Sequence, residues 1–522
     1  MSFHLGSPNN TYNRRGGGGG GGNRRGSGGG NNSMGGGNMG GGGGGHRSPL
    51  DKPISPEEEA KNKLTSLMVR IGDKVTTTAT LESNIEGLVG VLLPDLENNR
   101  STIVTILLKC ISQLPYKTPI YATIIGKMNQ KNPDFGKEIC ETIIHDINEN
   151  LKKQKFKQAK LLIRCIGCLV NTHVVSTSTM FEVFDILLSP LSQEYTQTRA
   201  DFYVHLVLTT LPWVGSSLSN EVEQLSKLFE DLETYLGGRS HAEKKFFQTF
   251  AENDDLLESL SKQVKLQKED SWNCESIIQI HKSFDFVDSQ QHPLASIVLP
   301  LNDEKFNYPT FTRPLFRIFD DSQDAIKPID RYIIEEYIVD ILYYFNGAHK
   351  EAAKFIYSLP VTTEIDAIVV ETLLSEAFKL PGSDFKLIYY SVMLVDLFKE
   401  QHQTIIPVFA YAITTLFENI DHLDTEVVER FATMFAHHLS NFEYKWVWGD
   451  WATCLTSQPS GDPTTDNLLH LQKKFIIHLL ESITRLSYLD KMKQSLPVEY
   501  HPYLPQLPQP NFKFLKSNGK NI

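Results

Sequence analysis

The chain carries apolar side chains at helical spacing over most of its length. From Ile103 to Leu114 they recur three, four, seven, eight and eleven positions after the first, and Pro115 follows the last of them. Alternating apolar and polar runs, which are typical of strands, are missing from the sequence. The pattern therefore predicts an all-α protein. Comparable stripes predict further helices at 121–128, 139–151, 162–170, 222–236, 334–345, 365–380, 385–398, 405–417 and 475–483.

Capping residues and prolines predict where some of these helices begin and end. Ser83 and Glu86 have the spacing of a capping box, which predicts a helix that begins there and ends at Pro94. Pro212 predicts a turn that folds the indole of Trp213 back onto the preceding helix. We therefore expect Trp213 to be a structural residue of the core.

Successive helix pairs follow one another at intervals of roughly 40 residues, which is typical of an irregular α-solenoid of the HEAT type. A large helical bundle would give similar periodicities, so that alternative stays open. Prolines and aromatic residues interrupt the pattern in the middle of the chain, where we predict an ordered linker packed on the helices. The predicted organisation is a disordered Gly-, Asn- and Arg-rich tail at 1–55, a first helical-repeat domain at 60–270, the packed linker at 271–325, a second helical-repeat domain at 326–492 and a proline-rich segment at 493–522.

The N-terminal tail differs from the rest of the chain in composition and charge. It holds few apolar groups to offset the entropy of ordering, which predicts disorder. Its five arginines precede the first acid, so the tail carries +5 and the remaining sequence −16, for a net charge of −11. Because phosphate affinity comes from clustered Lys and Arg, the acidic body is unlike an RNA-binding surface. Arg14, Arg15, Arg24 and Arg25 are therefore the candidate contacts to RNA or to an import receptor, although a passive extension is an equal alternative.

No residue pattern points to catalysis. The sequence has no phosphate-binding loop, nucleophile elbow or dinucleotide fingerprint. Cys165 and Cys168 lie on an apolar stripe without a second ligand pair, so we predict core residues rather than a zinc site. His437 and His438 point about 100° apart on a helix and cannot both chelate one ion. We predict no catalytic residue, no metal, no cofactor and no enzymatic activity.

Three further predictions concern charge and location. The acidic pair Glu335–Glu336 is predicted to lie on a solvated helix face. The sequence has neither a long apolar run nor a signal peptide, which predicts no contact with a membrane. Six scattered cysteines in a large chain are typical of reduced thiols inside the cell.

An aromatic segment at 435–451 holds three of the five tryptophans within six residues. Its helical stripe runs to Asn441, and the aromatic residues that follow fit no helical stripe, which predicts a helix end followed by an aromatic corner. Such a corner is either buried between helices or exposed as an anchor for a partner. We take Tyr444, Trp446, Trp448 and Trp451 as the candidate partner-facing residues, with the buried corner as the alternative.

The run from His437 to Trp451, His-His-Leu-Ser-Asn-Phe-x-Tyr-x-Trp-x-Trp-x-Asp-Trp, resembles the second helical domain in the large-subunit family of the nuclear cap-binding complex. A run so long and irregular is poorly explained by chance. Further stretches match that family in the same order, at 81–88, 171–174, 211–215, 316–320 and 485–488.

This resemblance implies helical domains similar to the middle domain of the initiation-factor scaffold. In that family the large subunit holds a small RNA-recognition-motif subunit, which binds the 7-methylguanosine cap, and does not contact the cap itself. The resemblance thus implies a non-enzymatic nuclear scaffold, able to shuttle to the cytoplasm, that meets capped RNA only indirectly. Its further partners would be import, splicing, export and decay factors.

The resemblance implies a third helical domain in the family, and we expect no counterpart of that domain in this sequence, which stops where it would begin. We therefore expect the small subunit to meet the second domain alone and to bind more weakly. The expected contacts are the aromatic corner and the proline-rich stretch Pro502–Pro510. Two alternatives remain at this point: direct RNA binding through the Gly/Arg tail, and a general protein-interaction scaffold in translation.

Overall fold

The regular structure of the protein is helical. The computed structural model describes residues 56–73, 77–192, 196–240, 255–301, 306–310, 317–319, 326–361, 364–458 and 460–505. Within these ranges every regular element is a helix, so the prediction of an all-α helical-repeat fold is confirmed. None of the described helices is both long and apolar enough to cross a bilayer. The tail arginines Arg14, Arg15, Arg24 and Arg25 lie outside the described residues.

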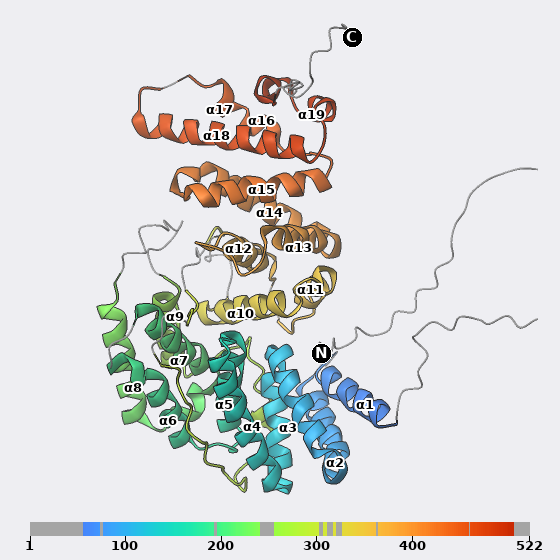
Figure 1. The fold of residues 1–522 in the computed structure, drawn as a ribbon, viewed down its shortest axis with the longest axis vertical. Helices are drawn as coiled ribbons and strands as arrows, with labels where there is room; N and C mark the ends of the chain where they lie inside the picture. The colour runs from blue at the N-terminus through green and yellow to red at the C-terminus, as the bar shows by residue number, and fades with distance from the viewer. Residues whose placement is uncertain are drawn as a thin grey trace, which may run out of the picture. The chain divides into compact units, whose positions relative to one another are not determined.

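Figure 1 labels the helices in chain order. Those of the first half are α1 (Pro56–Arg70), α2 (Thr78–Gln113), α3 (Thr118–Lys131), α4 (Pro133–Lys152), α5 (Phe156–Val170), α6 (Thr177–Leu188), α7 (Gln197–Leu218), α8 (Val222–Gly238) and α9 (Leu256–Glu269). Those of the second half are α10 (Pro328–Tyr344), α11 (His349–Ile356), α12 (Asp366–Ala377), α13 (Leu387–Glu400), α14 (His402–Glu418), α15 (Thr425–Asn441), α16 (Trp448–Trp451), α17 (Thr453–Thr456), α18 (Pro463–Arg485) and α19 (Leu489–Ser495). Short 3₁₀ helices lie at Pro115–Lys117, Ser189–Ser192, Ile280–Ser283, Ile420–His422 and Val498–Tyr503.

In the second half, a helix typically packs against the helix two positions further along the chain. Helices α10, α12 and α14 form one row, and α11, α13, α15 and α18 form another. The row that contains α10 continues through α9, α7, α5 and α3 in the first half. Figure 1 shows α15 and α18 lying side by side at the end of the second row. Each helix thus buries its apolar face mainly against near neighbours in sequence, which is the organisation of a helical repeat.

Helix α2 begins earlier than predicted. Its N-cap is Thr77, whose side chain accepts a hydrogen bond from Thr80 N at 3.3 Å. Ser83 and Glu86 therefore lie inside the helix, and the predicted capping box is wrong. The Thr77 side chain satisfies a free amide of the first turn, which is the role that the predicted capping box would have had about one and a half turns later.

Helix α2 also continues past its predicted end. Pro94 lies within the helix, which runs to Gln113 through a kink at Asn99, where φ is −124° and ψ is 19°. Leu92 and Leu96 are buried on either side of the proline. The apolar face is therefore continuous across Pro94, and its packing outweighs the one backbone hydrogen bond that proline removes.

Trp213 is a core residue, as predicted, although the predicted turn is wrong because Pro212 lies inside α7. Only 4% of the Trp213 surface is exposed. The guanidinium of Arg164 lies 3.9 Å from the centroid of its ring. Asn171 Nδ2 donates a hydrogen bond to Trp213 O at 2.7 Å. The indole thus joins α5 to α7 through packing and a cation–π contact.

The chain after α9 packs closely on the helices of the first half. Trp272 has a positive φ of 61°, and its ring lies so close to Gly215 of α7 that a Cβ there would stand 2.2 Å from the ring. Only glycine permits this approach. Ser276 N donates a hydrogen bond to Asp330 Oδ1 at 2.6 Å, which fastens the segment to the first turn of α10.

Further along, the same segment is hydrogen-bonded to α3 and α4. Asn129 Nδ2 donates to Gln290 O at 2.8 Å, and Asn129 Oδ1 lies 2.8 Å from His292 Nε2. Val298 N donates to Asn148 Oδ1 at 2.8 Å. Side-chain amides of the helices thus satisfy polar groups of an extended chain and hold that chain against α3 and α4.

Candidate functional site

The aromatic corner begins where α15 ends, as the sequence pattern indicates. The helix ends at Asn441, and Glu443 and Tyr444 have left-handed φ values of 57° and 60°. Tyr444 N donates a hydrogen bond to Leu439 O at 2.8 Å, which satisfies a carbonyl of the last helical turn. Two consecutive residues with left-handed backbone conformation turn the chain sharply towards α16.

The structure places three of the four candidate aromatic residues in the core. Trp451 is 2% exposed and stacks on Phe417 with ring centroids 4.0 Å apart. Trp448 is 5% exposed, and its Nε1 donates to Tyr444 O at 2.9 Å. Tyr500 Oη donates to Trp448 O at 2.5 Å. The partner-facing prediction is therefore wrong for the buried Tyr444, Trp448 and Trp451, because helices of the same chain cover these rings.

Trp446 is the one candidate of the four that keeps part of its surface open. Its ring packs edge-on against Phe435, with centroids 4.8 Å apart, and against Trp451 at 5.5 Å. The neighbouring Val447 is 54% exposed. Contact between Trp446 and a partner stays a prediction.

The proline-rich stretch Pro502–Pro510 is described only as far as Pro505. Its start packs against the second half of the chain. Tyr503 Oη donates to Leu455 O at 3.3 Å, and the ammonium of Lys473 lies 5.1 Å from the Tyr503 ring centroid. The remainder of the predicted partner contact lies outside the described residues.

The histidine pair belongs to the packing of α15. The ring of His438 lies among Phe398, Phe409 and Phe442, with centroids between 4.5 and 4.9 Å away. Burial, assisted by His437, lowers the pKa of His438 to about 4. Within the described residues, no group of three or more His, Cys, Asp or Glu could hold a metal ion.

Cys165 and Cys168 are buried on α5, as their apolar stripe predicts. Burial raises the pKa of Cys168 to about 12 and the pKa of Cys165 well above its ordinary value. Both therefore remain protonated thiols at neutral pH, and neither has the exposed thiolate character of a reactive cysteine.

A buried cluster of four charged side chains joins α5 to α10. Lys160 Nζ lies 2.5 Å from Glu336 Oε2 and 3.5 Å from Asp340 Oδ1. The guanidinium of Arg164 lies 3.3 Å and 3.9 Å from the same two carboxylates and donates to Thr209 Oγ1 at 2.9 Å. Two cations balance two carboxylates, so the cluster can hold its charges without solvent.

The two carboxylates of this cluster differ in protonation behaviour. Burial opposes ionisation of both, but Lys160 and Arg164 hold the pKa of Glu336 below its usual range. For Asp340 burial dominates and raises the pKa, with Glu336 adding to the effect and Lys160 opposing it. The shorter contacts belong to Glu336, which explains why it is the better stabilised carboxylate.

The acidic pair Glu335–Glu336 is buried, so its predicted solvated position is wrong. Glu335 is 3% exposed and Glu336 is 5% exposed. Arg331 Nε and an amino group of Arg317 lie 3.3 Å and 3.0 Å from Glu335 Oε1. Two adjacent carboxylates are tolerated inside the fold because each has its own cationic partners.

A short stretch before α10 is fixed by the buried carboxylate of Glu371. Ile318 N and Phe319 N donate to Glu371 Oε1 at 2.5 Å and 3.1 Å, and Arg331 pairs with the other oxygen. This places Phe319 against Tyr411 of α14, with ring centroids 5.3 Å apart.

Helix α14 is apolar on both of its sides. Its inner side chains, among them Phe409 and Ile413, are buried. On the opposite side Ile406 is 46% exposed and Tyr411 is 55% exposed. We call this side the α14 outer face, and it consists of Gln403, Ile406, Pro407, Ala410, Tyr411 and Thr414 at helical spacing.

The α14 outer face also lacks charge. From His402 to Phe417 the sequence has no Asp, Glu, Lys or Arg. Pro407 lies on this face and has no N–H to donate to the preceding turn of the helix. An uncharged helix face with exposed Ile and Tyr side chains is unusual in water, so this face has the character of a protein-interaction surface.

Sequence reasoning missed the α14 outer face because it counted apolar residues only towards the buried stripe. The available signal was the uncharged run from His402 to Phe417, since a helix with one solvated face normally carries charges there. The prediction instead followed aromatic density, which in this chain marks core packing.

Comparison with known proteins gives the family. The MIF4G domain model matches residues 66–279, and the model described as MIF4G like matches residues 329–498. Nuclear cap-binding protein subunit 1 of Aedes aegypti is 32% identical over 494 residues, which cover 91% of this chain and 59% of that protein. The protein of the same name from Anopheles gambiae is 32% identical over 487 residues, covering 90% of this chain and 59% of that protein.

The chain thus spans about 59% of the length of these relatives. The similarity extends over nearly all of the present chain and includes both helical halves. It agrees with the resemblance carried by the run from His437 to Trp451. The chain therefore belongs to the family of nuclear cap-binding protein subunit 1.

Proposed function

We propose that this protein is a non-enzymatic scaffold subunit of the nuclear cap-binding complex. Its relatives are named as a cap-binding subunit, and a subunit implies a partner. In the proposal, a small RNA-recognition-motif subunit binds the 7-methylguanosine cap and this chain holds that subunit in place. The MIF4G and MIF4G-like regions support the role, because helical repeats offer extended surfaces to protein partners.

The α14 outer face is the observation that supports this proposal, and it identifies the residues that would contact the partner. Tyr411 and Ile406 offer apolar surface that costs little to desolvate, and an aromatic side chain at the centre of such a patch is a typical binding hot spot. The net charge of −11 disfavours direct contact with phosphates. Both features support contact with the capped RNA through a protein partner.

The proposal extends to the organisation of the chain. It assigns the first helical-repeat domain to 60–270, the linker to 271–325 and the second domain to 326–492, with the small subunit on the second domain. The tail arginines would serve nuclear import or a weak RNA contact, and the complex would recruit processing, export and decay factors in the nucleus. The nuclear naming of the relatives supports this location.

Fluorescence quenching by 7-methylguanosine triphosphate tests whether the cap is bound by this chain or by the small subunit. The isolated chain should show no quenching up to high micromolar ligand, whereas the chain mixed with the small subunit should bind the cap analogue. Micromolar or tighter binding by the isolated chain would contradict the proposal.

Calorimetric titration with the small subunit tests the surface. The double variant Ile406→Asp/Tyr411→Asp should lower affinity by about tenfold or more, since two carboxylates would be desolvated at the contact. Val222→Asp is the matched control, because Val222 is 65% exposed on α8 and lies outside the α14 outer face. Equal affinity for the double variant and the control would place the interface elsewhere.

The same titration tests whether further helical sequence is required. Adding a third helical domain, in cis or in trans, should tighten binding if the small subunit is held from two sides. Equal affinity with and without that domain would contradict a two-sided clamp.

A further inference from the structure

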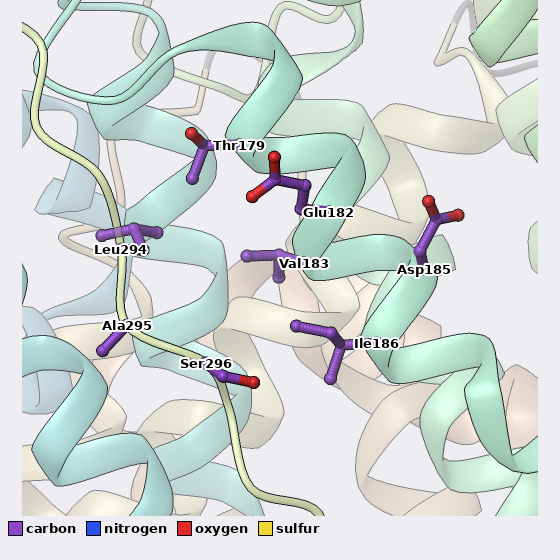
Figure 2. A pocket seen from close by; sticks show the side chains of 8 residues that line it. All are labelled: Thr179, Glu182, Val183, Asp185, Ile186, Leu294, Ala295 and Ser296. Atoms are coloured by element: carbon purple, nitrogen blue, oxygen red, sulfur yellow. The ribbon is translucent and has the colours of Figure 1, made fainter.

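A groove of about 390 Å³ lies between α6 and an extended segment of the chain (Figure 2). The segment follows the part that is hydrogen-bonded to α3. One wall is formed by Thr179, Glu182, Val183, Asp185 and Ile186 of α6, and the other by Leu294, Ala295 and Ser296.

The extended wall presents backbone groups without partners. Across the described part of the chain, neither the N–H nor the C=O groups of Leu294, Ala295 and Ser296 form a hydrogen bond with the protein. Both flanks are fixed, because His292 N donates to Val174 O at 2.9 Å and Val298 N is held by α4. A fixed, extended and unpaired edge is the feature to which an incoming peptide adds as a strand.

The helical wall supplies negative charge. Glu182 and Asp185 are exposed and lie one turn apart on α6. Neither carboxylate has an ion-pair or hydrogen-bond partner among the described residues. In Figure 2 the Glu182 carboxylate extends from α6 on the side that faces the segment 294–296, whereas the Asp185 carboxylate extends away from that segment. A cation between the walls would therefore meet an unpaired carboxylate.

The space between the walls has an apolar base. Val183 is 3% exposed, and Ile186 and Leu294 are partly buried. Their side chains come from opposite walls of the groove. An aliphatic side chain placed here would gain contact with both walls, whereas a charged one would be desolvated without a partner at the base.

We propose that this groove binds an extended basic peptide of a partner protein. The main chain of the peptide pairs with residues 294–296, an aliphatic side chain rests on Val183 and Ile186, and flanking Lys or Arg side chains pair with Glu182 and Asp185. Nucleic acid does not fit this chemistry, because unpaired carboxylates repel phosphates. The proposal is independent of the proposed scaffold role, since it uses neither α14 nor the small subunit.

The probe for a direct test is a fluorescein-labelled peptide, Gly-Lys-Arg-Ile-Arg-Lys-Gly, titrated with the full chain and followed by fluorescence anisotropy. We expect saturable binding at micromolar concentration. The charge reversal Glu182→Lys/Asp185→Lys should weaken binding by about tenfold or more, as loss of close charge pairs does at other interfaces. The matched control Glu230→Lys/Asp231→Lys changes the net charge equally on the exposed surface of α8 and should leave binding unchanged.

A second probe tests the main-chain contact without altering the protein. Methylation of the central isoleucine amide removes one donor, so this peptide should bind several-fold more weakly than its unmethylated form. The helical circular dichroism of each protein variant confirms that it is folded.

Three results would overturn the proposal. Equal losses in the charge reversal and its control would show nonspecific attraction to the acidic body. Unchanged affinity of the methylated peptide would exclude pairing with residues 294–296. Absence of peptide binding would exclude a peptide site.

Discussion

Neutralising Glu336 should destabilise the fold far more than neutralising Asp340, although both carboxylates belong to one buried cluster. Glu336→Gln leaves Lys160 without the carboxylate that lies 2.5 Å away, and Arg164 without the one at 3.3 Å. Arg164 is fully buried, so water cannot replace the lost partner. Removing one member of a buried ion pair typically costs about 3–5 kcal/mol, and we expect a loss in this range.

The same substitution changes the pH dependence of stability. Because the pKa of Glu336 is held below its ordinary value of 4.5, the stabilisation from its charge is present above about pH 4.5 and is lost as the pH falls further. Glu336→Gln has no such carboxylate. The stability difference between the wild type and this variant should therefore narrow below about pH 4.5.

Asp340→Asn should cost about 1 kcal/mol or less. Burial raises the pKa of Asp340, so the folded state does not favour its charge. Its Oδ2 has no hydrogen-bond partner among the described residues, and its cations lie at the longer distances of 3.5 Å and 3.9 Å. The asparagine leaves Lys160 and Arg164 paired with Glu336.

Urea unfolding followed by tryptophan fluorescence measures both effects, with Asp231→Asn on the exposed side of α8 as the control. The indole of Trp213 lies against Arg164, so its fluorescence reports on the contact between α5 and α10. Equal shifts of the unfolding midpoint in Glu336→Gln and Asp340→Asn would refute the assignment of unequal roles. An unshifted midpoint in Glu336→Gln would refute the stabilising role of the cluster.

Three further substitutions test the packing. Trp213→Ala should cost about 3–5 kcal/mol in the same urea experiment, and an unchanged midpoint would show that its ring does not support the core. Gly215→Ala should lower the melting temperature, because the new Cβ would stand 2.2 Å from the Trp272 ring, whereas Gly449→Ala meets nothing within 4 Å and should not. The lowered pKa of His438 means that the unfolded chain binds the extra proton, so stability should fall by about 3 kcal/mol as the pH drops from 6.5 to 4. His438→Phe should remove that part of the pH dependence, and a variant that keeps it would contradict the assignment.

Periodicity predicts the helices of this chain because most of them bury one continuous stripe. The predicted segment 365–380 corresponds to α12 and 385–398 to α13, with shifts of only a few residues. Two of the wrong helix boundaries come from prolines. Pro94 and Pro212 were expected to end helices, but each lies inside one, because tertiary packing of a long apolar face exceeds the roughly 3 kcal/mol that an internal proline costs.

The candidate site was harder to predict because exposure depends on residues far away in the sequence. Trp451 is covered by Phe417 of α14, and Trp448 by Tyr500 beyond α19. No local sequence pattern around 435–451 indicates that these distant residues cover the two tryptophans. Conversely, the exposure of Tyr411 follows from the absence of any described helix over the outer side of α14, which an apolar sequence gives no reason to expect.

The buried charges explain how two helical regions with separate family matches become one continuous row. An apolar contact between α5 and α10 would tolerate sliding by a turn, since any stripe of Leu and Ile fits several registers. The contact of Lys160 and Arg164 with Glu336 and Asp340 does not, because a shift of one turn would leave at least one charge buried without a partner. The cluster therefore fixes the register at which α10 continues the row that α3, α5, α7 and α9 begin. Since α12 and α14 follow α10 in that row, the position of the α14 outer face depends on this contact.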